Sequence, residues 1–184
     1  MRKIYVILGS RNDLTQCIKG LQLLNNWDEK GEIKFMGVLI ASFHRNMLSV
    51  LGELNTLHLM PPKQRPDVVI LGAGKANHLT GSGDAFLRNT LRDNRIRIFG
   101  VAFENKKNPE DTEAAISSIT QVPGTQVVFN AYVGPDGFYR ACFDAVSLDL
   151  KNIKLEDPKP VERLSGKEAL KIGLGIKNKR KGGK

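Results

Sequence analysis

Residues 66–83, PDVVILGAGKANHLTGSG, decide the fold, because a short apolar run is followed at once by a loop rich in glycine. A continuous apolar run such as PDVVIL is typical of a strand that is buried on both faces. The loop after it carries Lys75 and His78, which places a cation and a titratable ring beside bare backbone at the end of a strand. Aligned from Gly72, GAGKAN lacks the last glycine of the dinucleotide-binding fingerprint, so the sequence does not match that motif.

The alternation of strand and helix continues on both sides of this stretch. Apolar runs predict five strands, at residues 3–8, 33–40, 67–71, 96–103 and 125–133. Apolar residues at helical spacing predict helices at 13–27, 47–60, 83–94, 108–120 and 136–150, with Asp13 as the first N-cap. We therefore expect an α/β fold, a three-layer flavodoxin-like sandwich with a parallel five-stranded sheet.

The positive charge is concentrated at the C-terminal end of the chain, whose net charge is +9. Residues 151–184 hold eleven Lys and Arg against four Asp and Glu, a net of +7, whereas residues 1–150 hold seventeen against fifteen, a net of +2. We expect a catalytic domain at 1–150 and a basic extension at 151–184, partly disordered or docked on a neighbouring subunit. The extension has no aromatic residue, so a nucleic-acid partner is the least favoured interpretation.

The composition gives no indication of secretion or of membrane insertion. No early segment reads as a signal peptide, and no apolar run approaches the roughly 20 residues that cross a bilayer. Cys17 and Cys142 form no metal motif and are expected to be buried thiols in a reducing compartment. The sequence therefore predicts a cytoplasmic protein with no membrane partner.

Three loops should meet at one edge of the sheet, because the carboxyl ends of parallel strands lie side by side. They are GSRND (9–13), ASFHRN (41–46) and GAGKANHLTGSG (72–83). Serine hydroxyls and arginine bind phosphate, a carboxylate accepts hydrogen bonds from sugar hydroxyls, and histidine moves protons near neutral pH. The side chains with these uses are Ser10, Asp13, Ser42, His44, Arg45, Lys75 and His78, and Gly9, Gly72 and Gly74 let a ligand approach the backbone.

Most of these residues also have a purely structural interpretation. Ser10 and Asp13 fit a turn and a helix cap, and a single loop histidine is more often structural than catalytic. His58, on a helix face, is assigned a structural role. The coincidence of His44 and His78 at one edge favours a site, although neither has further ligands at metal spacing, so no metal is expected.

In combination, the loops resemble those of the N5-carboxyaminoimidazole ribonucleotide mutases of purine biosynthesis, the PurE-type catalytic subunits of phosphoribosylaminoimidazole carboxylase. The family loop G-S-x-S-D corresponds to GSRND, S-A-H-R to SFHR, and G-A-G-G-A-A-H-L-P-G to GAGKANHLTG. A later family segment, S-I-V-Q-M-P-x-G-V-P-V, is similar to SITQVPGTQVVF (118–129). The four segments follow the family order within residues 3–150.

The resemblance implies a role for each matching position. Ser10 and Asp13 would hold the phosphate and ribose of the substrate, and Ser42 and Arg45 would lie on the phosphate side. His44 would be the catalytic histidine, moving a proton as the carboxylate leaves N5 and joins C4. His78 would be the second catalytic residue, in a loop that lines the carboxylate or the released CO2. The further substrate-binding positions implied are Gly9, Gly72, Ala73, Gly74, Lys75 and Leu79.

The activity implied by the resemblance is the interconversion of N5-carboxyaminoimidazole ribonucleotide and 4-carboxyaminoimidazole ribonucleotide, with no metal or organic cofactor, in a homo-octamer. Two alternatives stay open: a CO2-dependent aminoimidazole ribonucleotide carboxylase, and a divergent non-catalytic nucleotide-binding homologue. His78 in an H-L-x-G setting favours the mutase, and the retention of His44 and Arg45 speaks against a lost activity.

Five loop positions depart from the family pattern. They are Asn12 for serine, Phe43 for alanine, Lys75 for glycine, Asn77 for alanine and Thr80 for proline. Phe43 and Lys75 are expected to add bulk to the site, and Lys75 also adds a positive charge. These departures bear on the identity of the substrate more than on the fold.

Overall fold

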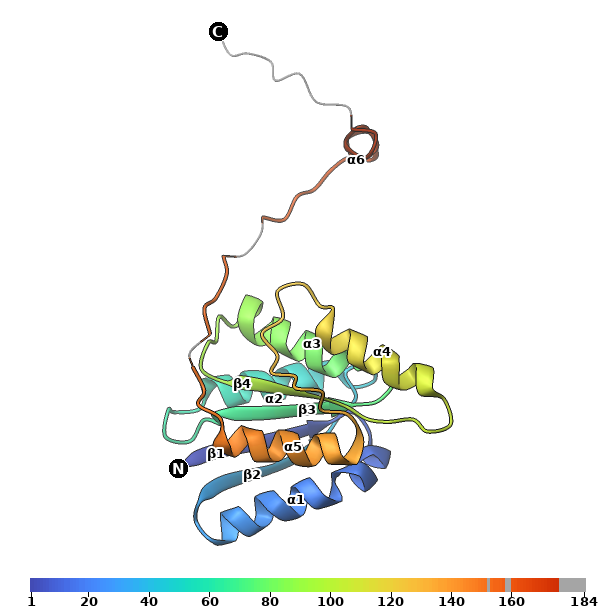
Figure 1. The fold of residues 1–184 in the computed structure, drawn as a ribbon. Helices are drawn as coiled ribbons and strands as arrows, with labels where there is room; N and C mark the ends of the chain where they lie inside the picture. Colours follow the sequence, from blue (N-terminus) through green and yellow to red (C-terminus); the bar gives the residue numbers. More distant parts are fainter. Residues whose placement is uncertain (152, 158–159, 176–184) are drawn as a thin grey trace.

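The computed structural model describes residues 1–151, 153–157 and 160–175, whose chain path is drawn in Figure 1. Its elements in chain order are β1 (Arg2–Leu8), the 3-10 helix η1 (Arg11–Asp13), α1 (Leu14–Glu29), β2 (Ile33–Ile40), α2 (Met47–Leu59), β3 (Val68–Ala73), α3 (His78–Ala85), the π-helix η2 (Phe86–Thr90), β4 (Arg97–Ala102), α4 (Pro109–Thr120), α5 (Gly134–Ser147) and α6 (Gly166–Gly173). The predicted α/β class is confirmed.

Within the described residues the sheet has four parallel strands in the order β2-β1-β3-β4. A bulge interrupts β2, because four residues from Phe35 to Val38 lie opposite three from Ile4 to Val6. Gly37 absorbs the extra residue with φ +122°, a conformation that L side chains rarely adopt. The chain turns back at each carboxyl end into a helix, so the ends of β1, β2 and β3 share one edge.

The prediction of a fifth strand at 125–133 is wrong. This segment runs beside β4 but pairs with it only at two isolated parallel bridges, Phe99 to Val128 and Ala102 to Val133. Six residues of the segment therefore span four residues of β4, so a regular ladder cannot form, and Ala131 takes a φ of +49° within the excess. The segment is apolar, as the pattern indicated, but it packs against β4 without forming a continuous ladder of backbone hydrogen bonds.

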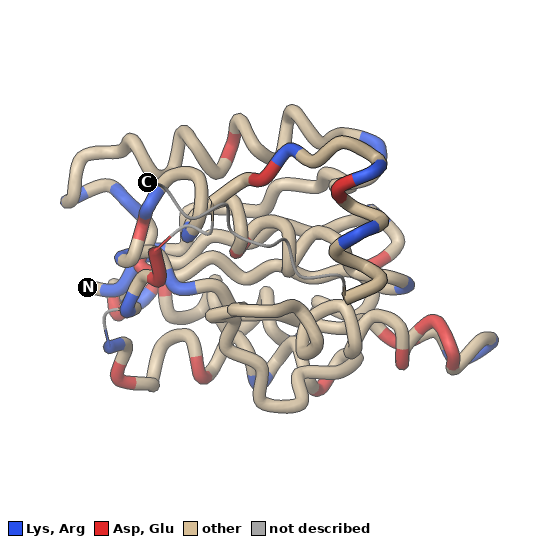
Figure 2. Tube along the Cα trace, turned by 90° about the horizontal axis from the view of Figure 1, so that it is seen from above, with Lys and Arg blue, Asp and Glu red and all other residues tan. Residues whose placement is uncertain are grey.

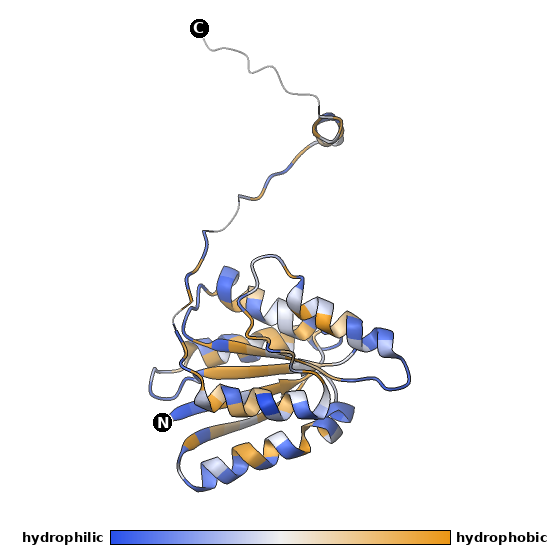
Figure 3. Ribbon diagram, viewed as in Figure 1, coloured by the Kyte–Doolittle hydropathy of each residue, from blue (hydrophilic) through white to orange (hydrophobic). Residues whose placement is uncertain are grey.

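Helices cover both faces of the sheet, giving three layers (Figure 1). One core cluster joins α1 and α5 to β1 and β4 through side chains such as Leu24, Phe138 and Ile4. The other joins α2 and α3 to the opposite face, where Leu54 and Leu79 pack near Leu71. Figure 3 shows the apolar strands enclosed between helices that carry both apolar and polar residues. No helix in the described part of the chain is long and apolar enough to span a bilayer.

The helix after β3 begins at His78, five residues before the predicted start at residue 83. The glycines that argued for an extended loop instead let this helix pack closely. A Cβ on Gly81 would lie 2.9 Å from Val122 Cγ2, and one on Gly83 would lie 2.7 Å from Leu71 Cδ1. These two glycines serve the contact of α3 with α4 and β3, which a local pattern does not reveal.

The segment after α5 leaves the body and ends, within the described residues, in α6 (Figure 1). Its first part is fastened to the body: Ile153 is buried, its N–H donates to Asn94 O, and Arg92 donates to Glu156 O. Ser165 and Glu168 form a reciprocal capping box at the start of α6. The basic end of the extension, at 176–184, lies outside the described residues.

Charged residues of both signs are spread around the body, with several Lys and Arg gathered near the N-terminus (Figure 2). Arg2, next to the N-terminus, has structural partners. Arg2 Nη1 lies 3.0 Å from Ala145 O, 2.6 Å from Val146 O and 2.8 Å from Leu148 O, which satisfies carbonyls at the end of α5. These contacts give Arg2 a structural role.

Candidate functional site

A cavity of ≈ 630 Å³ opens at the carboxyl edge of the sheet, and the loops after all four strands contribute to its wall. Such a volume suits a small ligand, since ligand pockets typically measure about 300–1,000 Å³. The cavity is lined by eleven of the twelve predicted site residues: Gly9, Ser10, Asp13, Ser42, His44, Arg45, Ala73, Gly74, Lys75, His78 and Leu79. The topology therefore brings together side chains that lie up to 70 positions apart in the sequence, from Gly9 to Leu79.

Gly72 is the predicted site residue that does not line the cavity. It lies within β3, and a Cβ added there would fall 2.7 Å from Phe103 Cε2 and 3.4 Å from Leu8 Cδ2. Its lack of a side chain admits the buried Phe103 ring rather than a ligand. Phe103 itself lines the cavity, so Gly72 shapes the floor of the site indirectly.

The first loop presents Ser10 and Asp13. Ser10 Oγ accepts a hydrogen bond from Asn12 N–H at 3.2 Å and caps η1, which leaves the hydroxyl proton free to donate to a ligand oxygen. Asp13 occupies the N-cap position of α1 but makes no capping hydrogen bond with its side chain, so only the position of the predicted cap is correct. Burial raises the pKa of Asp13 to about 6, while a hydrogen bond with the Ser10 backbone acts in the opposite direction.

The second loop is a compact turn that precedes α2. Ser42 O accepts hydrogen bonds from the amides of Arg45, at 3.2 Å, and Asn46, at 2.7 Å. This turn leaves the side chains of His44 and Arg45 exposed at the cavity, and neither forms an ion pair within the described residues. Phe43 lines the cavity but also packs against the core beside α2, so part of its expected bulk is taken up by the interior.

Two departures in the third loop form one structural unit. The Asn77 side chain accepts from Thr80 N–H at 3.3 Å and donates to Val101 O at 3.0 Å. The Thr80 hydroxyl lies 2.9 Å from Asn77 Oδ1 and 3.1 Å from Leu71 O. Asn77 therefore caps α3 and ties it to β4, while Thr80 ties it to β3. Both residues are buried, so their polar groups need these partners and are explained without a ligand.

Lys75 and His78 are the exposed members of the third loop. His78 is the first residue of α3, at the end where unpaired amides favour an anion. Lys75 adopts φ +50°, in the left-handed region that favours glycine. Both side chains line the cavity. No Asp or Glu of the described residues lies within ion-pair distance of either one.

The fourth loop, which was not among the predicted site loops, also lines the cavity. Phe103, Glu104 and Asn105 contribute to the wall, together with Gln16 from α1. Gln16 Nε2 donates to Glu104 O and Gln16 Oε1 accepts from Glu104 N–H, both at 3.0 Å, which fixes this backbone at the cavity. The available signal was the polar run ENKKN that directly follows the strand at 96–103, on the same edge as the other loops.

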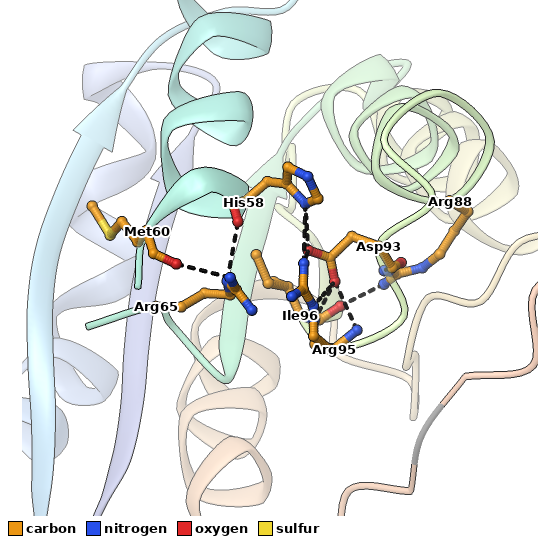
Figure 4. Close-up of polar contacts among 7 residues, drawn as sticks. All are labelled: His58, Met60, Arg65, Arg88, Asp93, Arg95 and Ile96. Carbon is orange, nitrogen blue, oxygen red and sulfur yellow. Dashed lines mark hydrogen bonds and ion pairs between the residues drawn. The ribbon is translucent and has the colours of Figure 1, made fainter. Parts of the chain in front are cut away.

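The opposite end of the molecule holds a polar network around the buried carboxylate of Asp93 (Figure 4). His58 Nδ1 lies 2.6 Å from Asp93 Oδ2, and Arg95 Nη2 lies 2.9 Å from the same oxygen. Burial acts to raise the pKa of Asp93, but hydrogen bonds from Arg95, His58 and Ile96 outweigh it and hold that pKa well below its usual range. His58 thus joins α2 to the turn before β4, in the structural role predicted for it.

The described residues contain no group of three His, Cys, Asp or Glu side chains placed to hold a metal ion. Cys17 and Cys142 are both buried free thiols, as predicted. Burial raises the pKa of the Cys17 thiol to about 12, with a further contribution from Asp13, so this sulfur is a poor nucleophile.

Searches against protein-family models and curated proteins gave no match. Among solved structures, the chain is similar to a crystal structure of PurE from Treponema denticola, with a TM-score of 0.50 and 16% sequence identity. The similarity covers 79% of this chain and 87% of that chain. At this identity the likeness shows a common architecture, and it bears out the resemblance noted in the loops at that level: the chain has a divergent PurE-like α/β fold.

Proposed function

We propose that the protein interconverts N5-carboxyaminoimidazole ribonucleotide and 4-carboxyaminoimidazole ribonucleotide, as a cytoplasmic homo-oligomeric enzyme of purine biosynthesis. The observation that carries the proposal is the gathering of Ser10, Ser42, Arg45, His44 and His78 on one cavity of a PurE-like fold. Each of these positions matches the family motif in the loop that contains it. The octameric state implied by the resemblance belongs to the same proposal.

The phosphate of the ligand is assigned to Arg45 with the hydroxyls of Ser10 and Ser42. Arg45 supplies a fixed cation and both hydroxyls supply donors, because their oxygens already accept backbone N–H groups. Asp13, at the start of α1, is assigned to the ribose hydroxyls. In its ionised form a carboxylate accepts such hydrogen bonds, so binding of the sugar favours the charged state of a group whose pKa burial raises to about 6.

His44 is assigned the proton transfer. The N5–carboxylate bond breaks to release CO2, and N5 gains a proton; C4 then bonds to CO2 and loses its own proton, so protons balance over the cycle. A single histidine that is exposed in the cavity is suited to both steps, because an imidazole can act both as a proton donor and as a proton acceptor. His78 and the backbone of Gly74 are assigned to the side where CO2 is held.

An absorbance assay tests the proposal. Purified protein is mixed with 4-carboxyaminoimidazole ribonucleotide, and the absorbance of this substrate is followed over time. The assignment would be supported if the wild-type protein consumes the compound, so that its absorbance falls, and His44→Asn leaves the absorbance unchanged. Formation of aminoimidazole ribonucleotide and CO2 as the products, with a loss that added bicarbonate slows, would move the activity to the CO2-dependent carboxylase. Binding of the compound without turnover would leave a nucleotide-binding homologue, and unchanged turnover in His44→Asn would remove His44 from the proton transfer.

A further inference from the structure

Lys75 holds a backbone conformation that disfavours a side chain. Its φ of +50° lies in the left-handed region, whereas neither flanking glycine of the loop, Gly72 or Gly74, has a positive φ. A residue with a Cβ is strained in this region, and the strain would be absent with glycine, the residue of the family motif. A strained position that lies on a ligand cavity points to a use for the side chain there.

The charge of Lys75 is available to a ligand. The residue is exposed, it lines the cavity, and no acidic group of the described residues lies within 4.0 Å of its ammonium. The two acids that line the same cavity, Asp13 and Glu104, likewise form no ion pair in this part of the chain. The positive charge at this loop is therefore not neutralised by the protein.

A second cation, Arg45, comes from a different loop. Arg45 precedes α2 and Lys75 precedes α3, so the two cations approach the cavity from two separate strand ends. A ligand with one anionic group needs only one of them. His78 at the start of α3 adds donor capacity on the Lys75 side, where the amides at the helix start favour an anion.

We propose that Lys75 is a specificity-determining residue, which selects a phosphorylated ribonucleotide whose base carries a carboxylate over the same nucleotide without it. The inference rests on the proposed function for the identity of the ligand. Arg45 engages the phosphate, and the Lys75 ammonium pairs with the carboxylate on the base. The neutral amine form of the base offers Lys75 no anion, so the selectivity is electrostatic and decreases as salt is added.

Calorimetric titration of two ligands tests this assignment: 4-carboxyaminoimidazole ribonucleotide and aminoimidazole ribonucleotide, which lacks the carboxylate. All proteins carry His44→Asn so that neither ligand is converted. The variants are Lys75→Gln, which removes the charge, Lys75→Arg, which keeps it, and Lys75→Gly, which removes both charge and strain. The matched control is Lys107→Gln, an exposed lysine of the fourth loop that does not line the cavity.

We expect Lys75→Gln and Lys75→Gly to raise the dissociation constant of the carboxylated ligand about tenfold or more, which is the usual contribution of a charge-assisted hydrogen bond. The dissociation constant of the other ligand should stay unchanged. Lys75→Arg and Lys107→Gln should keep the preference. If the binding of both ligands is weakened equally, or the binding of neither is weakened, the role of Lys75 is overturned and the proposed function is unaffected. Absence of binding by both ligands to the parent protein would overturn the proposed function and the inference with it.

Discussion

Replacement of Asp13 by asparagine should stabilise the protein at neutral pH. Asp13 is half-buried at the cavity, and its carboxylate makes no capping hydrogen bond at the start of α1. Burial raises its pKa from 3.8 to about 6. Because the raised pKa belongs to an acid, the folded state binds this proton more tightly than the unfolded state, and ionisation between about pH 4 and pH 6 removes stability. Asparagine keeps the shape and never ionises.

The magnitude follows from the difference between the two pKa values. A shift of about two units corresponds to about 3 kcal/mol, at 1.36 kcal/mol for each unit. Since Asp13 faces an open cavity, solvent screening reduces this to about 1 kcal/mol. That difference corresponds to a rise in Tm of about 2–4 °C for a chain of this size. The gain should come with weaker ligand binding, because an amide replaces an acceptor carboxylate at the site.

Urea denaturation at pH 4, 5, 6 and 7.5 measures the effect as the difference in free energy of unfolding between Asp13→Asn and wild type. The difference should be near zero at pH 4 and grow to about 1 kcal/mol in favour of the variant by pH 7.5. Glu104→Gln, which removes an exposed carboxylate from the same cavity, is the control and should stay within about 0.5 kcal/mol of wild type. A variant that is less stable than wild type at pH 7.5, or a difference independent of pH, would refute the reasoning.

Four further substitutions test the structural contacts, each by urea denaturation at pH 7. Asp93→Ala should cost about 1–3 kcal/mol, because it removes the acceptor of the buried amide of Ile96, and Arg95→Ala, which removes an exposed partner and keeps that bond, should cost less than about 1 kcal/mol; equal losses would contradict the network. Asn77→Ala should cost about 1–2 kcal/mol through the lost cap of α3, and a neutral result would show that Asn77 is dispensable there. Gly72→Ala should cost about 1–3 kcal/mol by crowding the Phe103 ring, and an unchanged stability would mean that the ring moves freely.

The order of elements and the edge that carries the cavity could be predicted from the sequence. Continuous apolar runs such as 67–71 identify buried strands, and the parallel arrangement then fixes which loops converge. The three loops predicted from that rule do line one cavity. The fifth strand failed because its pairing depends on how residues 125–133 are spaced against β4, which the local apolar pattern does not contain.

Glycine was the least reliable guide within the candidate site. Gly74 lines the cavity, whereas Gly72, Gly81 and Gly83 make room for the side chains of Phe103, Val122 and Leu71. A sequence shows that a residue has no side chain, but the neighbour that requires this lies elsewhere in the chain. Conversely, the left-handed position of the third loop is occupied by Lys75, which no rule based on glycine would identify.

The departures from the family pattern are of two kinds once their contacts are known. Asn77 and Thr80 bond to each other and to neighbouring strands, so they are a coupled structural replacement. Lys75 has no such partner in the described residues and faces the cavity. The hypothesis of an altered substrate therefore depends on Lys75 more than on the other substitutions in that loop.

Chemical-shift mapping with 4-carboxyaminoimidazole ribonucleotide would locate the ligand on the protein whether or not turnover occurs. Our account predicts saturable shifts of the backbone amides of Ser10, Ser42 and Gly74, and none around His58 at the other end of the sheet. Shifts confined to the C-terminal extension or to the His58 network, or no shifts at millimolar ligand, would contradict the placement of a ribonucleotide site at the carboxyl edge.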